Sequence, residues 1–292
     1  MKTVKDWVIA TRPWSFPASI IPVLAIGAFL HAQGDVDGLH VLLALLMMVL
    51  FQASGNLISD YYDHVRGVDL EGSLNQVRDI QSGKFTPREI LHYGYCLLAA
   101  AVLFGLGLLA LTSWNLIWLG AAAVFAVTCY MWLKAHVLGD LTILLCYAIL
   151  PAIGTSFVGT GSLHPLVIPI CLPFGLLTVA ILHANNMRDI QNDRRAGVLT
   201  FAGWMGGRAS KWVYIAEIIV PFLLTAVYSL LSWMPLWSLT WLTLPLAWPL
   251  VKRVAAIQPE EDVAIASLDQ QTAKLQLAFG LLYAFTFFLS AP

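Results

Sequence analysis

The chain has 292 residues, of which 59% are hydrophobic and 11% are charged, and its formal net charge is −1. A water-soluble domain of this length carries roughly twice that share of charged residues, so the composition excludes an ordinary soluble protein. The net charge says nothing useful about partners, and no nucleic-acid partner is expected.

Apolar segments long enough to cross a bilayer recur along the whole chain. Helices satisfy every backbone hydrogen bond within such a segment, so the pattern predicts an all-α, polytopic membrane protein with a single domain over 1–292. Nine transmembrane helices are predicted, at 14–33, 38–58, 92–112, 114–133, 139–160, 164–184, 212–231, 235–251 and 274–291.

The basic residues give this arrangement a direction. With nine spans, all sixteen Lys and Arg residues fall on one side of the membrane, whereas the loops on the other side contain Asp35 and Asp37 but no Lys or Arg. Basic loops stay in the cytoplasm. We therefore expect the N-terminus and the long polar connections, 59–91 and 185–211, in the cytoplasm, the C-terminus outside, and a bacterial inner membrane as the location.

Two polar clusters stand where apolar segments end, both on the basic side. Each has an amide followed at helical spacing by two carboxylates, at i, i+4 and i+7 in one cluster and at i, i+4 and i+8 in the other, so the members of each share a helix face. Carboxylates near a bilayer are costly and indicate function. The clusters are Asn56, Asp60 and Asp63, and Asn185, Asp189 and Asp193.

Such a cluster has an ordinary structural explanation, because Asp and Asn cap helices and form turns. Two clusters with matched Asn-x-x-x-Asp spacing on one side of the membrane favour a function instead. Magnesium binds one or two carboxylates together with substrate phosphates. The pair therefore predicts a magnesium site for a diphosphate, with arginines nearby to neutralise the remaining charge.

At these residues the chain resembles the UbiA superfamily of intramembrane prenyltransferases, and within it the 1,4-dihydroxy-2-naphthoate branch of menaquinone synthesis. The segments that carry the resemblance are Trp7–Val23, Asn56–Asp69, Arg78–Pro87, Asn185–Thr200 and Ala273–Leu282. The chain departs from the branch at Val198, where a basic residue is usual, and at Asn75-Gln76-Val77, where Gly-Pro-Leu is usual.

The resemblance implies a bundle of nine helices around a central cavity with cytoplasmic cap loops. It also implies Mg²⁺-assisted transfer of a polyprenyl group from a polyprenyl diphosphate to an aromatic acid, with loss of carbon dioxide from the naphthoate. The metal ligands would be Asp60, Asp63, Asp189 and Asp193, helped by Asn56 and Asn185. Arg78 and Arg188 would join the four aspartates in catalysis, and Lys134, Asp69, Asp140 and Arg12 would contact substrates. The prenyl tail would lie in an apolar channel open to lipid.

Other functions fit the same features. A 4-hydroxybenzoate prenyltransferase, or another aromatic prenyltransferase of this superfamily, is the nearest alternative. A cation-coupled transporter is the alternative of a different class, because carriers also bind cations through carboxylates near their spans. Glu217 lies inside an expected span and is interpreted as a neutral, hydrogen-bonded structural residue.

Overall fold

The computed structural model describes residues 2–34, 36–65, 80, 82–235, 238–257 and 265–290. Helices account for almost all of these residues, and within them no β-strand occurs, only an isolated bridge between His136 and Leu199. Eight helices of the described part are long and apolar enough to cross a membrane. The expectation of an all-α polytopic membrane protein is confirmed.

The helices follow one another in the order that the sequence predicts. A short α1 (Val4–Ala10) precedes four long helices, α2 (Pro17–Gln33), α3 (Gly38–Val65), α4 (Pro87–Leu111) and α5 (Leu116–Ala135). The fifth span consists of α6 (Gly139–Leu144), a π-helical turn (Leu145–Ile149) and α7 (Leu150–Thr160). The remaining helices are α8 (Val167–Arg188), α9 (Ile190–Arg195), α10 (Phe201–Met205), α11 (Gly207–Leu230), α12 (Leu244–Ala256) and α13 (Leu268–Leu289).

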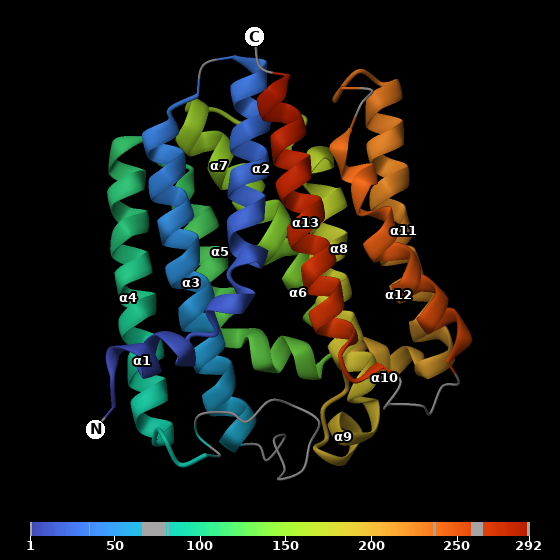
Figure 1. Cartoon of the computed structure of the whole chain (residues 1–292). Coiled ribbons are helices and arrows are strands. Elements are labelled where there is room, and N and C mark those ends of the chain that lie inside the picture. The colour runs from blue at the N-terminus through green and yellow to red at the C-terminus, as the bar shows by residue number, and fades with distance from the viewer. Residues whose placement is uncertain are drawn as a thin grey trace.

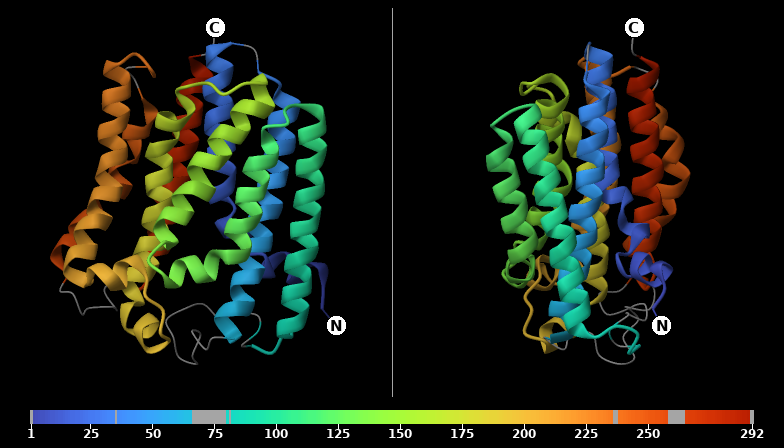
Figure 2. Two further views of the ribbon diagram at one scale, coloured as in Figure 1. Left: turned by 180° about the vertical axis from the view of Figure 1, so that it is seen from behind. Right: turned by 90° about the vertical axis from the view of Figure 1, so that its left-hand side faces the viewer.

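The long helices run side by side between two ends of the bundle (Figures 1 and 2). The short helices α1, α9 and α10 lie at the lower end of Figure 1, where the described chain also begins, and α13 finishes at the upper end. Because the described chain starts and finishes at opposite ends, it crosses the bundle an odd number of times. The nine predicted crossings agree with this arrangement.

The eighth predicted span, 235–251, differs from the expectation of one long helix. A 3-10 turn (Leu239–Thr243) leads into α12, which has only 13 residues and has Pro245 in its first turn. Proline is favoured at the start of a helix, because the N–H that it lacks would have no partner within the helix there, so α12 begins at this point. These two short elements together return the chain from the upper end to the lower end (Figure 1).

The predicted end of the second span, at residue 58, lies too early in the sequence. α3 continues as far as Val65, so the whole of the first polar cluster lies on its last turns. Hydropathy ends where polar residues begin, but the backbone hydrogen bonds of a helix do not depend on the polarity of its side chains. The predicted loop from residue 59 onward therefore begins with helix.

The main core lies between α2, α8, α11 and α13, where aromatic rings pack edge to face. Phe279 of α13 contacts Phe222 of α11 with ring centroids 5.3 Å apart, and Phe287 contacts Phe29 of α2 at the same separation. These ring pairs bury large apolar areas in a preferred geometry, which fixes α8 and α13 at the centre of the bundle.

Two buried tyrosines compensate for a proline within the core. Pro173 in α8 cannot donate to the carbonyl of Pro169 four residues earlier, and the hydroxyl of Tyr228 donates to that oxygen instead, at 2.8 Å. The hydroxyl of Tyr283 donates to the neighbouring carbonyl of Ile170 at 2.9 Å. In an apolar region a free carbonyl is costly, so these bonds allow α8 to keep its proline.

Gly280 allows α13 to approach α2 closely, and this gives a testable prediction. A β-carbon at Gly280 would lie 2.3 Å from Cγ2 of Ile21, too close for real atoms, whereas a β-carbon at Gly107 would meet nothing within 4 Å. We expect Gly280→Ala to lower the free energy of unfolding by about 1–3 kcal/mol through overpacking. Gly107→Ala, the matched control, should leave it unchanged or raise it. Thermal unfolding in detergent measures both, and equal melting temperatures would contradict the close approach.

Candidate functional site

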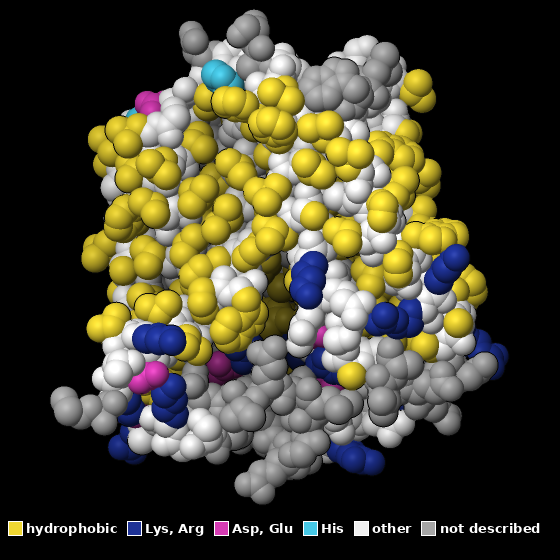
Figure 3. All heavy atoms as spheres, viewed as in Figure 1, with side chains coloured by type: hydrophobic (Ala, Val, Ile, Leu, Met, Phe, Trp, Pro, Cys, Tyr) yellow, Lys and Arg dark blue, Asp and Glu magenta, His cyan; other side chains and the backbone are white. Residues whose placement is uncertain are grey.

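Charged side chains gather at the lower end of the bundle. On the face shown in Figure 3, Lys and Arg side chains lie in the lower half, and hydrophobic side chains cover the band above them. A hollow opens at the level of the uppermost of these Lys and Arg side chains in the same view. α3 and α8 both end at this charged end, which brings the two polar clusters to the same part of the molecule (Figure 1).

The first cluster lies on the last turns of α3. Its amide, Asn56, donates from Nδ2 to the carbonyl of Thr11 and to the hydroxyl of Ser15, both at 2.8 Å. The Oδ1 atom of Asn56 accepts from Gln52 one turn earlier, at 3.2 Å. Asn56 therefore ties the start of the chain to α3, and its side chain has three partners within the protein.

The N-terminal segment also contacts the first carboxylate of this cluster. Arg12 has a left-handed backbone conformation, with φ of 55°, and its guanidinium forms an ion pair with Asp60. Asp6 pairs with Lys84 at 2.8 Å, and the ring of Trp7 packs edge-on against Phe85 with centroids 4.6 Å apart. This segment thus crosses the end of the bundle with Arg12 directed at the cluster.

The second cluster spans the junction of α8 and α9. Arg188 is buried and donates from Nε and one terminal nitrogen to both carboxylate oxygens of Asp189, at 3.0 and 2.9 Å. It also hydrogen-bonds the Oδ1 atom of Asn185 and lies 3.3 Å from a carboxylate oxygen of Asp269 on α13. Such a planar, bidentate pairing fixes the orientation of the carboxylate. Arg188 therefore holds the cluster in shape and joins it to α13.

Asp63 of the first cluster and Asp193 of the second lie within electrostatic reach of each other. Burial raises the pKa of Asp193 to about 6, and the charge of Lys134 on α5 works against that rise while the charges of Asp189 and Asp63 add to it. Asp193 is 2% exposed, and its Oδ2 atom is buried with no hydrogen-bond partner among the described residues. Three helical segments thus bring carboxylates and one ammonium group within electrostatic reach of one another.

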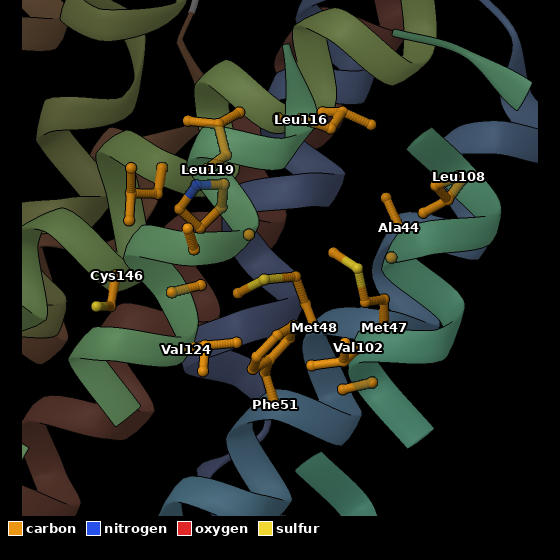
Figure 4. Close-up of a pocket in the computed structure, with 18 of the residues that line it drawn as sticks. Ala44, Met47, Met48, Phe51, Val102, Leu108, Leu116, Leu119, Val124 and Cys146 are labelled. Carbon is orange, nitrogen blue, oxygen red and sulfur yellow. The ribbon is translucent and has the colours of Figure 1, made fainter. Parts of the chain in front are cut away.

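An apolar cavity of about 600 Å³ lies between α3, α4, α5 and the fifth span. Figure 4 shows Met47, Met48 and Phe51 of α3 directed into it from one side and Val124 of α5 from the other. The cavity is also lined by Gln52, the residue that donates to Asn56 one turn further along α3. The apolar space therefore ends next to the first cluster.

The π-helical turn of the fifth span contributes to the cavity wall. Pro151 has no N–H to donate, and the backbone N–H of Leu150 reaches back five residues to the carbonyl of Leu145. Cys146 and Tyr147, within this wide turn, line the cavity. Wide turns of this kind occur often at functional sites because they redirect side chains.

The comparisons with known proteins agree with this arrangement. The sequence profile of the UbiA prenyltransferase family matches residues 19–289. The chain belongs to this family. It is 34% identical to "UbiA prenyltransferase domain-containing protein 1" of Danio rerio, over 97% of this chain and 84% of that protein. The protein of the same name from Homo sapiens is 33% identical, over 98% of this chain and 84% of its own length.

Solved structures of UbiA homologues share the fold. The apo structure of a homologue from Aeropyrum pernix K1 has a TM-score of 0.67 at 12% identity, covering 94% of this chain and 97% of that one. A homologue from Archaeoglobus fulgidus, "bound to GPP and Mg2+", has a TM-score of 0.61 at 17% identity, covering 96% and 99%. The assignment to the UbiA family is confirmed, and membership of a prenyltransferase family favours an enzyme over the cation-coupled transporter.

The structure places most of the predicted site residues and leaves two undescribed. Asp69 and Arg78 lie outside the described residues. The charge of Lys134 acts on Asp193, and its proposed contact with a substrate stays a prediction. Arg12, expected to contact a substrate, pairs with Asp60. Asp140 is buried and its carboxylate contacts His183 and Asn186.

Val198, which stands where a basic residue is usual, is buried next to the second cluster. Its backbone N–H donates to the carbonyl of Asp193 at 2.8 Å, and the residue is 5% exposed. Arg194 and Arg195, the arginines just before Val198 in the sequence, are both exposed, and Arg194 donates to the carbonyl of Gly203. The charges of Lys134 and Arg188 act to lower the pKa of Asp193.

Sequence reasoning missed the buried polar group around His183. This histidine stands two residues before Asn185 in an apolar helix and is fully buried, which is the signal that could have singled it out. The interpretation of Glu217 as a hydrogen-bonded residue is also not met. Its Oε2 atom is buried without a partner, and Oε1 lies 3.9 Å from Nδ1 of His183, beyond hydrogen-bond distance.

The raised pKa of Asp193 gives a pH prediction for the protein freed of divalent metal. Folded Asp193 holds its proton up to about pH 6, while in the unfolded chain its pKa is 3.8. The folded state therefore binds more protons between these values, and stability falls as the pH rises through this window. Melting temperatures in detergent with chelator should show this fall, and Asp193→Asn should flatten it. The same slope in both proteins would contradict the burial of this carboxyl.

Proposed function

We propose that this chain transfers a polyprenyl group from a polyprenyl diphosphate to an aromatic acid, with Mg²⁺ as cofactor. The acceptor proposed is 1,4-dihydroxy-2-naphthoate, which would lose carbon dioxide, as in menaquinone synthesis. The observation that carries the proposal is the combination of two carboxylate clusters, with Asp63 and Asp193 within electrostatic reach of each other, and an apolar cavity of about 600 Å³ that borders the first cluster at Gln52. A polyprenyl diphosphate needs both: carboxylates that hold Mg²⁺ for its diphosphate, and an apolar cavity for its hydrocarbon chain.

The side chains at the cluster fit a hard divalent cation. Buried carboxylate oxygens are the ligands that Mg²⁺ prefers, and Asp193 offers one that has no hydrogen-bond partner among the described residues. The residues that would hold the metal are Asp60, Asp63, Asp189 and Asp193, with Asn56 and Asn185. When bound, Mg²⁺ would neutralise the diphosphate and stabilise it as a leaving group.

Basic residues at the site have distinct tasks in this proposal. Lys134, whose charge already acts on Asp193, would attract the diphosphate. Arg188 would keep Asp189 and Asn185 in place through its buried hydrogen bonds rather than contact the substrate directly. Arg12, now paired with Asp60, would come next to the diphosphate once Asp60 turns to the metal. Arg78 and Asp69 remain proposed contributors from outside the described residues.

The cavity would take the prenyl chain. Its walls are almost entirely apolar, and it starts one helical turn from Asn56, so a diphosphate at the clusters would place its tail directly there. Apolar walls also exclude water, which would otherwise capture the allylic cation formed as the carbon–oxygen bond breaks. The aromatic ring of the acceptor is electron-rich and would attack that cation.

Several comparisons support the choice of substrates. Two structures of a UbiA homologue from Archaeoglobus fulgidus contain Mg²⁺, one with GPP and one with DMAPP. The naphthoate acceptor is supported by the resemblance of the segments around Asn56–Asp63 and Asn185–Asp193 to that branch. Asp140 was expected to position the acceptor, and its contacts with His183 and Asn186 give it a different use, argued below.

The location is proposed from charge. The described Lys and Arg side chains gather at the end of the bundle that holds the clusters (Figure 3), so we place this end in the cytoplasm. The relatives from Danio rerio and Homo sapiens named above are animal proteins, and the bacterial inner membrane stays a prediction from sequence.

The proposed function predicts the effect of removing single carboxylates. Purified protein with Mg²⁺, a polyprenyl diphosphate and the naphthoate should form a prenylated product whose mass shows the loss of carbon dioxide. Asp63→Asn and Asp193→Asn should each lower kcat/KM by roughly a hundredfold or more, because each removes charge that acts on the transition state. Asp37→Asn, an exposed carboxylate before α3, is the control and should keep full activity.

The product mass separates the possible outcomes of this assay. A product from 4-hydroxybenzoate that keeps its carboxylate, with none from the naphthoate, would replace the acceptor and leave the prenyl transfer standing. Full activity in both cluster variants would overturn the metal site itself.

The cavity predicts how chain-length preference can be changed. Gly154 lines the cavity and its added β-carbon would meet only Leu119, at 3.9 Å, so Gly154→Phe should fill part of the space. We expect this variant to lose activity with long prenyl diphosphates and keep it with GPP. Gly107→Phe places the same ring on an open surface outside this cavity and serves as the control. An unchanged preference in Gly154→Phe would contradict the cavity as the tail site.

A further inference from the structure

A second group of metal-type ligands lies buried beside the second cluster but apart from its aspartates. Asp140 of α6, His183 of α8 and Glu217 of α11 each offer a ligand atom, and these atoms all lie within 4.8 Å of one another. His183 is fully buried, and the two acids are each less than 10% exposed. Nδ1 of His183 lies 2.8 Å from Oδ2 of Asp140. We call these three residues and Asn186 the His183 cluster.

The His183 cluster contains oxygen atoms that lack a partner. Oε2 of Glu217 and Oδ1 of Asn186 are buried and accept no hydrogen bond from any described residue. Asn186 has no exposed surface, and its Nδ2 atom donates to Asp140 at 3.3 Å, so its amide is oriented into the group. A buried acceptor without a donor is costly. Both unsatisfied atoms belong to residues that contact Asp140 or His183.

The charges of the His183 cluster do not balance either. Among the described residues, the only ion-pair partner of Asp140 or Glu217 is His183 itself, and neither acid pairs with an arginine or a lysine. A protonated imidazole would supply one positive charge for two carboxylates. It would still leave the oxygens of Glu217 and Asn186 without a donor. A divalent cation would neutralise both carboxylates and provide a partner for both oxygens.

The Nε2 atom of His183 has the kind of hydrogen-bond partner that it commonly has in histidines that bind a metal through Nδ1. Nε2 lies 3.1 Å from the carbonyl oxygen of Ser210 and 2.8 Å from its hydroxyl. A carbonyl can only accept, so this contact assigns an N–H to Nε2. Without a metal, Nδ1 donates a second N–H to the Asp140 carboxylate at 2.8 Å, and a bound metal ion would take the place of that proton. Histidines that bind metals through one nitrogen commonly donate the other N–H to a carbonyl in this way.

The geometry points to a closed transition-metal site, with Zn²⁺ as the best-fitting ion, formed by Asp140, His183, Glu217 and Asn186. One imidazole nitrogen and three oxygens suit zinc better than magnesium. Ligands roughly 2.1 Å from a tetrahedral zinc lie about 3.4 Å apart, so the present separations of 2.8 and 3.9 Å require only small movements.

Such a site would be structural. Four protein ligands leave no open position for a substrate, as is typical of structural zinc. The ion would join α6, α8 and α11 directly beneath Asn185, the first residue of the second cluster, and would so fix the end of α8. This use also accounts for a buried Asp140 and Glu217 in a membrane bundle, where an uncompensated carboxylate is expensive.

Metal analysis of the full-length protein tests the site without any reaction. The protein is purified in detergent, equilibrated with Zn²⁺ and then freed of loosely bound ions. Elemental mass spectrometry should then find about one zinc ion per chain. Replacement with Co²⁺ should give the visible absorption bands of a four-coordinate ion with nitrogen and oxygen ligands. Strong chelation should lower the melting temperature, and Zn²⁺ should restore it where Mg²⁺ does not.

Variants assign the metal to these residues. His183→Ala and Glu217→Gln should each lose the retained zinc and the cobalt bands. His136→Ala, an exposed histidine, and Asp193→Asn, in the proposed magnesium site, should keep both. Zinc lost on Asp193→Asn but kept on His183→Ala would assign the ion to the magnesium site and overturn the inference. Wild-type protein that retains no zinc and gives no cobalt bands would overturn it as well, whatever the variants do.

Discussion

Two buried carboxylates from different parts of the chain, Asp63 on α3 and Asp193 on α9, lie within electrostatic reach of each other. Burial is the main cause of the raised pKa of Asp193, and the charges of Asp189 and Asp63 add to it, so the pKa records the cost of placing carboxylates here. A protein keeps such a cost when a cation offsets it. The surrounding bundle supports the arrangement: Arg188 fixes the neighbouring Asp189, and Lys134 places a positive charge beside Asp193.

The bundle divides the two halves of the proposed substrate between regions of different polarity. On α3, Gln52 lines the apolar cavity and donates to Asn56, whereas Asp60 and Asp63 follow on the next turns. The single helix α3 therefore connects the apolar cavity to the charged cluster within a few residues. The π-helical turn with Tyr147 shapes the opposite wall. A membrane enzyme with one lipid and one polar substrate needs such a boundary inside the protein.

Some buried polar groups in the bundle are compensated by a neighbouring side chain. Tyr228 donates to the carbonyl that Pro173 leaves free, which lets α8 cross the core with a proline in it. In the group around His183, two buried oxygens, on Glu217 and Asn186, lack a hydrogen-bond partner among the described residues. They lie in a group that also brings three potential metal ligands within 4.8 Å of one another, and this combination is the reason to look for a cation there.

The sequence by itself determined the helices, their order and the two clusters, because hydropathy and helical spacing are local properties. It placed Asp60, Asp63, Asp189 and Asp193 on helix ends at one side of the bundle, and the family resemblance followed from the same residues. Only the tertiary structure decided the partners: Arg12 with Asp60, Arg188 with its own cluster, and Asp140 with His183. Those pairings join residues up to 48 positions apart, and they depend on how helices pack, which no local pattern encodes.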